Sequence, residues 1–327
     1  MRKFPILEIR MPHPLKPSAL RPGDTVRILS LSSPVDPARL DRGVAEITRL
    51  GYKSAVDRDA VLGRDGFFAG PGTARSAALR EALGEPSTKA IVCSRGGYGA
   101  NYLLPDFPAA VPGPPKIFVG YSDITSIQLL LWKRSHRVTF YGPMVASGFD
   151  HGPAAAQGYD IDSWHRGVTE TQTGWKLPLE SEPLVPGSAE GILLGGCMTL
   201  LETSLGTPWE LDTRGSILIL EDRGMKPWQV DRALTHLFQA GKFQGIAGIL
   251  MGDFPDCEAP QGTESVRDVA RRILVPLGVP LVWGAPIGHT ARPMLTLPLG
   301  IRARLGSPAS SFKTSPCLEI LEPACAP

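Results

Sequence analysis

The chain has 327 residues, of which 43% are hydrophobic and 20% charged, so it has enough apolar material for one large domain or two ordinary ones. Its 34 basic and 32 acidic side chains leave a net charge of +2, too small for the wide basic field of a nucleic-acid or membrane-surface binder. We therefore expect a small-molecule or peptide partner, no nucleic acid and no membrane.

The cysteines and the N-terminal segment bear on the compartment. The five cysteines are odd in number and lack CxxC spacing, which indicates reduced thiols rather than a disulfide framework or a zinc site. Near the N-terminus Pro5, Glu8 and Arg10 interrupt the short apolar stretch, so no signal peptide is expected. A run of about 18 apolar residues is also lacking, so no transmembrane helix is expected. The sequence thus favours a cytoplasmic protein.

In the first half, short apolar runs alternate with helical patterns. The apolar runs lie at residues 25–33, 89–99 and 116–123, and the helical patterns at residues 36–52 and 124–132. The first helical pattern has a start signal at Asp36 or Ser33 and a stop signal at Gly51. Continuous apolar strands between helices predict a parallel sheet that is covered on both faces.

Residues 149–187 are rich in glycine, proline and polar side chains, which predicts an inter-domain crossing with a large loop. Strand patterns resume at residues 216–222 and 245–254, with a helical pattern between them, and short strands are expected at 302–306 and 317–322. We predict an N-terminal domain over residues 1–165, a linker over 166–187 and a C-terminal domain over 188–327.

Ser122 lies where an apolar strand gives way to a helix, in the turn Gly-Tyr-Ser-Asp. In a parallel sheet such turns form the ligand-binding edge, and the helix N-terminus behind them favours an oxyanion. A nucleophilic serine needs this setting. The alternative is that Ser122 or Asp123 is an ordinary helix N-cap.

The turn over residues 94–100, SRGGYGA, ends a neighbouring strand. Its paired glycines, Gly96 and Gly97, allow backbone N–H groups to approach and bind an anion. The alternative is a glycine turn chosen only for its positive φ.

A catalytic serine needs a base, usually a histidine held by a carboxylate. His289 lies in a Gly- and Pro-rich turn just after a strand, and Glu221 closes an apolar strand. The other histidines lie in helical patterns, the N-terminal arm or the crossing loop. The alternatives are a satisfied loop histidine and a structural ion pair of Glu221 with Arg223 or Arg232. The residues alone indicate a possible Ser-His-Glu hydrolase.

Together these stretches resemble the LD-carboxypeptidase family of serine peptidases, which also contains the microcin C self-immunity proteins. The similarity spans nearly the whole chain and is carried by LRPGDTVRILSLSSPVDPARLDRGVAEITRLGY, GFFAGPGTARSAALREAL, SRGGYGANYLLPDF, KIFVGYSDITSIQLLLW, VTFYGPM, GILLGGCMTLLETSLGTPWEL, ILILEDRGMKPWQVDRALTHL and GAPIGHTARPMLTLPLG. Each motif alone is weak, but their order is specific. The resemblance implies an α/β fold with an N-terminal doubly wound parallel sheet, flavodoxin-like or class I glutamine amidotransferase-like, and a smaller C-terminal α/β domain.

The resemblance also implies the site. Ser122 would be the nucleophile and Glu221 and His289 would complete a Ser-His-Glu triad, with no cofactor and no metal. The oxyanion hole would use the N–H of Asp123 and of Gly96 or Gly97.

Some residues depart from the family pattern or extend it. Cys197 stands where the family's GGN pattern usually has asparagine, and the segment GPGTARSAALREAL lacks acidic residues often found there. Tyr98, Trp164 and Trp175 are expected to bind substrate. A loop aromatic would suit a nucleobase, as in the microcin-immunity branch, whereas the structural alternative is a loop anchor or a dimer interface.

The sequence thus predicts a homodimeric serine carboxypeptidase that hydrolyses an L,D amide bond and releases terminal D-alanine from cytoplasmic murein tetrapeptides during peptidoglycan recycling. The first alternative is a microcin-immunity-type peptidase acting on aminoacyl-adenylate-like peptides. The others are a non-catalytic anion-binding module and a metallopeptidase, for which no metal-ligand cluster is evident.

Overall fold

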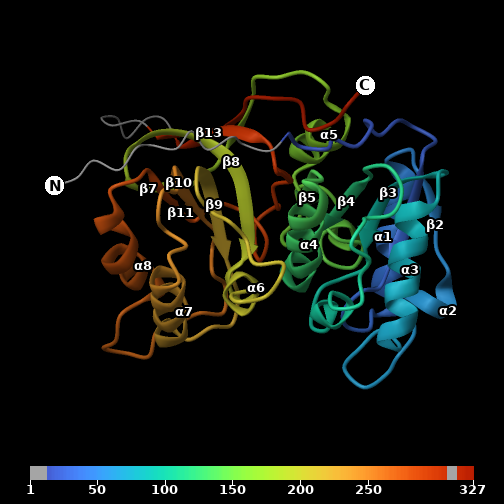
Figure 1. Ribbon diagram of the computed structural model, residues 1–327, viewed down its shortest axis with the longest axis horizontal. Helices are drawn as coiled ribbons and strands as arrows, with labels where there is room; N and C mark the ends of the chain where they lie inside the picture. The colour runs from blue at the N-terminus through green and yellow to red at the C-terminus, as the bar shows by residue number, and fades with distance from the viewer. Residues whose placement is uncertain (1–12, 308–314) are drawn as a thin grey trace.

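The computed structural model describes residues 13–307 and 315–327, which form two lobes, each built on its own sheet (Figure 1). The N-terminal stretch in which no signal peptide is expected lies outside the described residues. Within the described part, no helix is both long enough and apolar enough to cross a bilayer.

The first sheet has six strands in the order β12-β5-β4-β3-β1-β2. All neighbouring pairs are parallel except β12 with β5. Its strands are β1 (Thr25–Leu29), β2 (Lys53–Ala55), β3 (Thr88–Cys93), β4 (Ile117–Gly120), β5 (Thr139–Tyr141) and β12 (Leu297–Leu299). The helices of this part of the chain are α1 (Pro37–Arg49), α2 (Arg58–Val61), α3 (Gly72–Gly84), α4 (Thr125–Ser135) and α5 (Ile161–Thr169). The predicted parallel N-terminal sheet is confirmed.

Helix α1 shows why the local sequence signals were reliable. The Asp36 carboxylate accepts a hydrogen bond from the Arg39 N–H at 2.9 Å, so Asp36 is the N-cap. Leu40 and Ile47 are fully buried on one face, and burial of such side chains stabilises by roughly 1.5–3 kcal/mol each. Gly51, at φ +93°, follows the end of the helix.

The second sheet has eight strands in the order β6-β14-β13-β8-β9-β10-β11-β7. They are β6 (Trp175–Pro178), β7 (Glu182–Val185), β8 (Gly187–Cys197), β9 (Ser216–Glu221), β10 (Gly248–Met251), β11 (Leu281–Trp283), β13 (Arg302–Ser307) and β14 (Cys317–Ile320). Helices α6 (Met198–Thr203), α7 (Pro227–Gln239) and α8 (Val266–Leu274) complete this lobe. The predicted fold class, a parallel N-terminal sheet followed by a second α/β unit, is confirmed.

The crossing segment differs from the predicted loop, because it supplies helix α5 and the two edge strands β6 and β7. Both strands are only four residues long, and each contains a proline, Pro178 or Pro183. Proline is tolerated at sheet edges but weakens the strand signal in a sequence. These strands therefore depend on pairing with β14 and β11, far along the chain.

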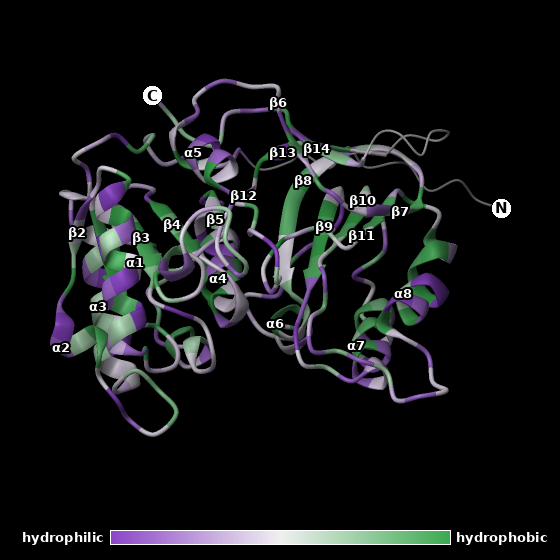
Figure 2. Cartoon of the chain, turned by 180° about the vertical axis from the view of Figure 1, so that it is seen from behind, coloured by the Kyte–Doolittle hydropathy of each residue, from purple (hydrophilic) through white to green (hydrophobic). Residues whose placement is uncertain are grey.

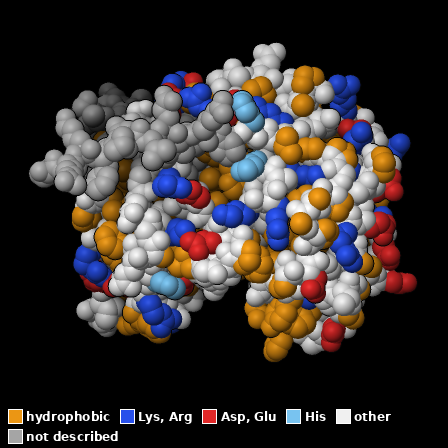
Figure 3. Space-filling view, viewed as in Figure 1, with side chains coloured by type: hydrophobic (Ala, Val, Ile, Leu, Met, Phe, Trp, Pro, Cys, Tyr) orange, Lys and Arg blue, Asp and Glu red, His pale blue; other side chains and the backbone are white. Residues whose placement is uncertain are grey.

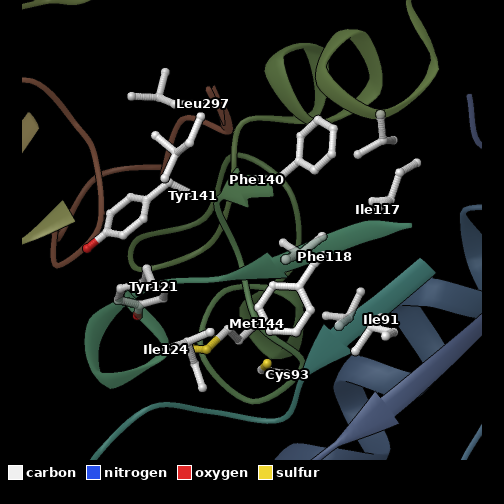
Figure 4. Close-up of a cluster of buried hydrophobic side chains, with 14 of the residues drawn as sticks. Ile91, Cys93, Ile117, Phe118, Tyr121, Ile124, Phe140, Tyr141, Met144 and Leu297 are labelled. Carbon is white, nitrogen blue, oxygen red and sulfur yellow. The ribbon is translucent and has the colours of Figure 1, made fainter. Parts of the chain in front are cut away.

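The strands form the apolar interior of both lobes, while the helices carry polar faces outward (Figure 2). In the first lobe, Phe118 on β4 and Phe140 on β5 are both buried and project from opposite faces of the sheet, because Val119 is the residue that pairs with Phe140 (Figure 4). The ring of Tyr141 points away from these two, with its oxygen directed toward the other lobe's side of the sheet. One end of β5 thus contributes to the core and the other to the boundary between the sheets.

The chain crosses between the lobes a second time after β11. The loop over residues 284–296 leaves the second sheet and leads into β12, which pairs antiparallel with β5 in the first sheet. His289 lies in this loop. The fold therefore brings His289 to the boundary of the lobes, beside the carboxyl ends of β4 and β9.

Candidate active site

Ser122 is separated from β4 only by Tyr121 and has φ +63°, a left-handed conformation that is unfavourable for a residue with a Cβ. It begins the 3-10 turn Ser122–Ile124, which leads into α4. Neither this turn nor α4 has a side-chain cap, so the capping alternative for Ser122 and Asp123 is not what the structure shows. A strained serine between a strand and a helix is the arrangement of a nucleophile elbow.

The carboxylate of Asp123 is turned into the protein. Its Oδ2 accepts hydrogen bonds from the Ser32 hydroxyl at 2.6 Å and from the Ala100 N–H at 2.7 Å. Burial raises the pKa of Asp123, and the bonds from Ser32 and Ala100 partly offset this effect. Asp123 thus ties together the turns that follow β1, β3 and β4, while only its backbone is available to a ligand at the pocket.

Glu221 and His289 are in direct contact. The buried Oε2 of Glu221 is 2.8 Å from His289 Nδ1 and accepts the His289 backbone N–H at 2.8 Å. Because an ionised carboxylate can only accept, Nδ1 carries the ring proton. The neutral imidazole therefore keeps its lone pair on Nε2, where a general base needs it.

The two groups change each other's acidity. Burial raises the pKa of Glu221, but the charge of His289 and the bonds from His289 and Tyr141 outweigh it and hold the pKa below its ordinary value. Burial lowers the pKa of His289, but the Glu221 carboxylate outweighs it and raises the pKa above its ordinary value. The pair thus favours an ionised glutamate beside a basic imidazole.

Tyrosines hold this pair from the first lobe. The Tyr141 hydroxyl donates to Glu221 Oε1 at 2.5 Å and accepts a long contact of 3.4 Å from the Ser122 N–H. The Tyr121 ring packs edge-on against His289, with ring centroids 5.1 Å apart, and its hydroxyl lies 2.9 Å from Ser147 Oγ. Both oxygens of the buried carboxylate therefore accept from a donor, Oε1 from Tyr141 and Oε2 from His289, as a buried charge requires.

The glycine turn after β3 lies against Ser122. A Cβ on Gly96 would lie only 2.9 Å from Ser122 Oγ, so only glycine leaves the hydroxyl free at this point. In the part of the chain that the structure describes, the N–H groups of Gly96, Gly97 and Asp123 have no protein acceptor. Unpaired amides in a pocket are suited to bind an anionic oxygen.

Ser122, His289 and the glycine turn line one pocket with a volume of about 350 Å³. Arg39, Arg95 and Arg223 also line it. Arg39 is paired with Asp150 at 2.6 Å and Arg223 with Asp256 at 2.5 Å. Among the described residues Arg95 has no carboxylate within ion-pair distance, and its guanidinium makes only a 3.4 Å contact with the Pro34 carbonyl. The pocket thus presents a free cation to a ligand.

Cys197 also lines the pocket, on the side of the second lobe. Burial raises the pKa of its thiol, and its Sγ lies 3.6 Å from Asp222 Oδ2. The same oxygen accepts the Thr199 N–H at 2.8 Å and hydroxyl at 2.7 Å. The position at which the family pattern usually has asparagine is therefore occupied by a protonated thiol, with Thr199 and Asp222 as its polar neighbours.

The predicted substrate-binding aromatics lie apart from this pocket's lining. Trp164 is 2% exposed on α5, with its ring against Phe149 at a centroid distance of 4.9 Å, and Trp175 is 7% exposed on the edge strand β6. Both act as packing residues where they lie. Tyr98 is 47% exposed and directly follows Gly97, at the margin of the pocket.

Sequence reasoning assigned no role to Tyr141, Arg95 or Thr199. Tyr141 lies in the quoted stretch VTFYGPM, but its importance depends on Glu221, which comes from another sheet. Arg95 lies inside the glycine turn, where the sequence predicted roles only for the glycines and Tyr98. A basic residue beside an anion-binding turn is the signal that would have identified it.

The comparisons with known proteins cover both lobes. Residues 26–142 match the LD-carboxypeptidase N-terminal domain family and residues 190–305 match the LD-carboxypeptidase C-terminal domain family. The probable murein peptide carboxypeptidase of Bacillus subtilis (strain 168) is 35% identical over 297 residues, which are 89% of this chain and 92% of that protein.

Two solved folds are similar as well. The crystal structure of muramoyltetrapeptide carboxypeptidase from Oxalobacter formigenes has a TM-score of 0.77 at 30% identity and covers 91% of this chain and 99% of that one. The microcin C7 self-immunity protein MccF of Escherichia coli is 28% identical over 89% of this chain and 92% of its own length. MccF in complex with aspartyl sulfamoyl adenosine has a TM-score of 0.85 at 26% identity, covering 96% and 100% of the two chains.

Proposed function

The chain belongs to the LD-carboxypeptidase family of serine peptidases, and from this premise we propose that it is a cytoplasmic LD-carboxypeptidase of peptidoglycan recycling. It hydrolyses the L,D amide bond that precedes the terminal D-alanine of a murein tetrapeptide. The observation that carries this proposal is the contact of Glu221 with both the Nδ1 and the backbone N–H of His289, in one pocket with the strained Ser122.

In this mechanism Ser122 Oγ attacks the carbonyl carbon of the scissile amide while His289 Nε2 takes the hydroxyl proton. The C–N bond then breaks, and the imidazolium gives its proton to the amine of the departing D-alanine. A water molecule, deprotonated by His289, releases the peptide from Ser122. Glu221 keeps Nδ1 protonated and stabilises the imidazolium in both steps.

The oxyanion hole consists of the Asp123 N–H and an N–H of the glycine turn, Gly96 or Gly97. The unpaired state of these amides and the close approach of Gly96 to Ser122 support this assignment. Asp123 can serve in this way because its carboxylate is bound to Ser32 and Ala100, away from the developing negative charge.

Arg95 binds the carboxylate of the terminal D-alanine. A carboxypeptidase must recognise a free carboxylate next to the scissile bond, and a guanidinium can bind it through two parallel hydrogen bonds. Arg95 lines the pocket beside Gly96, and the other two arginines there are already engaged by Asp150 and Asp256.

The test compares two substrates with the purified full chain. Release of D-alanine is measured from a diaminopimelate tetrapeptide, and cleavage is measured with an aspartyl-adenylate analogue. We expect turnover of the tetrapeptide that is lost in Ser122→Ala and insensitive to EDTA. Binding without turnover of either substrate would favour a non-catalytic anion-binding module, and sensitivity to EDTA would favour a metallopeptidase.

A microcin-immunity-type peptidase is the second candidate, because the MccF fold is highly similar and MccF is solved with an aminoacyl adenylate analogue. The sequence supported this second candidate through a tryptophan that could stack on a nucleobase. Trp164 and Trp175 are buried away from the pocket lining, so the tetrapeptide remains the first choice. Preferential cleavage of the adenylate analogue would reverse this order.

A homodimer remains part of the proposal. Light scattering on the purified chain would give its mass in solution, and a mass of one chain across the micromolar range would contradict it.

A further inference from the structure

Four aromatic side chains form a cluster that adjoins the pocket lining through Tyr98, the residue after Gly97, and that we call the aromatic platform: Phe67, Phe68, Tyr98 and Tyr102. Phe67 is 77%, Tyr98 47% and Tyr102 57% exposed. Large apolar side chains gathered on a surface commonly mark a binding site. In Figure 3, hydrophobic side chains gather on the first lobe's side of the notch between the lobes, and the platform residues belong to that lobe.

The rings of the aromatic platform are held in place by contacts with one another and with the residues beneath them. The ring of Phe68 lies at its centre, with centroid distances of 5.8 Å to Tyr98 and 5.3 Å to Tyr102. The guanidinium of the buried Arg75 lies 5.1 Å from the Phe68 centroid, and Arg75 also donates to the carbonyl of Gly99 at 2.9 Å. A Cβ on Gly99 would lie 2.5 Å from the Phe68 ring, so the ring rests on the glycine backbone itself.

These contacts attach the platform to the turn that carries the proposed oxyanion hole. Gly96 touches Ser122, and Tyr98 is two residues further on, so its Cα lies within about 7 Å of the Gly96 Cα. The Tyr98 N–H donates to Ser33 Oγ at 3.0 Å, which fixes the direction of the turn. The other rings extend the surface outward in steps of 5.3–6.4 Å between centroids.

The pocket itself, at about 350 Å³, is at the small end of the range for small-molecule sites. It therefore holds the reacting end of a tetrapeptide and leaves the far end outside. Three extended residues span roughly 10 Å, so the far end of a tetrapeptide bound at Ser122 can reach side chains that lie outside the pocket lining.

We propose that the aromatic platform is a subsite for the sugar ring at the far end of a muramoyl peptide. This inference rests on the proposed function and names the part of the substrate that lies beyond the peptide. A pyranose ring has an apolar C–H face that stacks on aromatic rings, and its hydroxyls match the phenol oxygens of Tyr98 and Tyr102, which lie 3.4 Å apart at the surface.

The test measures a ratio, kcat/KM for the muramoyl tetrapeptide divided by kcat/KM for the same tetrapeptide without sugar. The wild-type ratio should exceed one, and the double variant Phe67→Ala/Tyr102→Ala should lower it on the order of tenfold. Phe238→Ala is the matched control, because Phe238 is 53% exposed on α7 of the other lobe and should leave the ratio unchanged. Thermal unfolding confirms that the variants are folded.

Three outcomes would contradict the proposal that the aromatic platform is a sugar subsite. A ratio that is the same in wild type and double variant would show that the sugar is not bound there, while the proposed function would stand on cleavage of the free tetrapeptide. Equal losses on both substrates with a change of mass in light scattering would show an interface between two copies of the chain. Cleavage of neither peptide by the wild type would overturn the proposed function and the platform together.

Discussion

The hydroxyl of Tyr141, at the end of β5, donates a hydrogen bond of 2.5 Å to Oε1 of Glu221, at the end of β9. The two residues come from different sheets, so one buried contact joins the lobes inside the candidate site. Because the same hydroxyl lies 3.4 Å from the Ser122 N–H, it also links the carboxylate to the turn of the proposed nucleophile.

Tyr141→Phe should therefore weaken both stability and catalysis. It leaves a buried carboxylate oxygen without its donor, which costs roughly 1–3 kcal/mol of unfolding free energy. We expect kcat to fall on the order of tenfold with KM little changed, because Tyr141 positions Glu221 and does not touch substrate. Denaturant unfolding and steady-state kinetics test this, with Phe140→Leu as a core control that should affect stability alone. Full activity in Tyr141→Phe would contradict the positioning role.

Ser122→Ala should abolish turnover and leave the fold intact, since triad losses cost on the order of 10⁴–10⁶ in kcat. The φ of +63° adds a second expectation. Ser122→Gly should be equally inactive but at least as stable as Ser122→Ala, because glycine removes the Cβ that makes this conformation unfavourable. The comparison needs only two melting curves, and a clearly less stable glycine variant would argue against strain at this residue.

The pH profile of kcat/KM should report the His289–Glu221 pair. His289 must be neutral to act as a base, and its pKa is raised, so activity should rise with pH through a midpoint above about 6.5. Glu221→Gln should move this midpoint to lower pH and reduce the plateau on the order of 10⁴-fold. The stability that His289 contributes follows the opposite direction: it is present below about pH 6.5 and is lost as pH rises through the folded-state pKa. An unchanged midpoint in Glu221→Gln would contradict the expectation that the Glu221 carboxylate raises the pKa of His289.

Gly96→Ala should inactivate the protein without unfolding it. The new Cβ would lie 2.8 Å from the Ser122 Cβ and 2.9 Å from Oγ, so the hydroxyl must move. A displacement of the hydroxyl by about 1 Å can lower kcat on the order of 100-fold. Gly72→Ala is the control, because the nearest atom to a Cβ there is the flexible Arg75 Nη2 at 3.8 Å. Normal kcat in Gly96→Ala would mean that the glycine turn can move away from Ser122 and that catalysis does not require their close contact.

Arg95→Ala should raise KM for the tetrapeptide on the order of 10- to 100-fold, as expected for loss of a charge-assisted hydrogen bond of about 1.5–3 kcal/mol. The C-terminal amide of the same peptide provides the sharper measurement. Wild type should strongly prefer the free carboxylate, and Arg95→Ala should lose most of that preference. If Arg95→Ala kept the preference, another group would have to bind the carboxylate.

Much of the first lobe could be predicted from the sequence because its signals are local. Helix α1 carries its own cap at Asp36 and its own apolar face, and strands β1, β3 and β4 are short, mostly apolar runs. The edge strands β6 and β7 could not be predicted, since they are short, contain proline and form only through partners distant in sequence.

The site shows the same division. Ser122, Glu221 and His289 could be identified because each lies at or just after the end of an apolar strand. The role of Tyr141 has no local signature, because it depends on a contact with Glu221 of the other sheet. Trp164 shows the converse limit: its place in a polar segment favours a binding residue, whereas helix α5 buries it against Phe149. Burial set by distant packing is not visible in the neighbouring residues.

The return of β12 to the first sheet affects how the protein folds while it is being synthesised. A ribosome makes the chain from its N-terminus, and N-terminal units generally begin to fold before the rest is made. Here Ser122 lacks His289, and the first sheet lacks its outer strand β12, until residues 284–299 have emerged. A nascent or prematurely terminated chain would carry the serine but no base beside it. Hydrolytic activity would thus begin only after His289 and β12 have been synthesised.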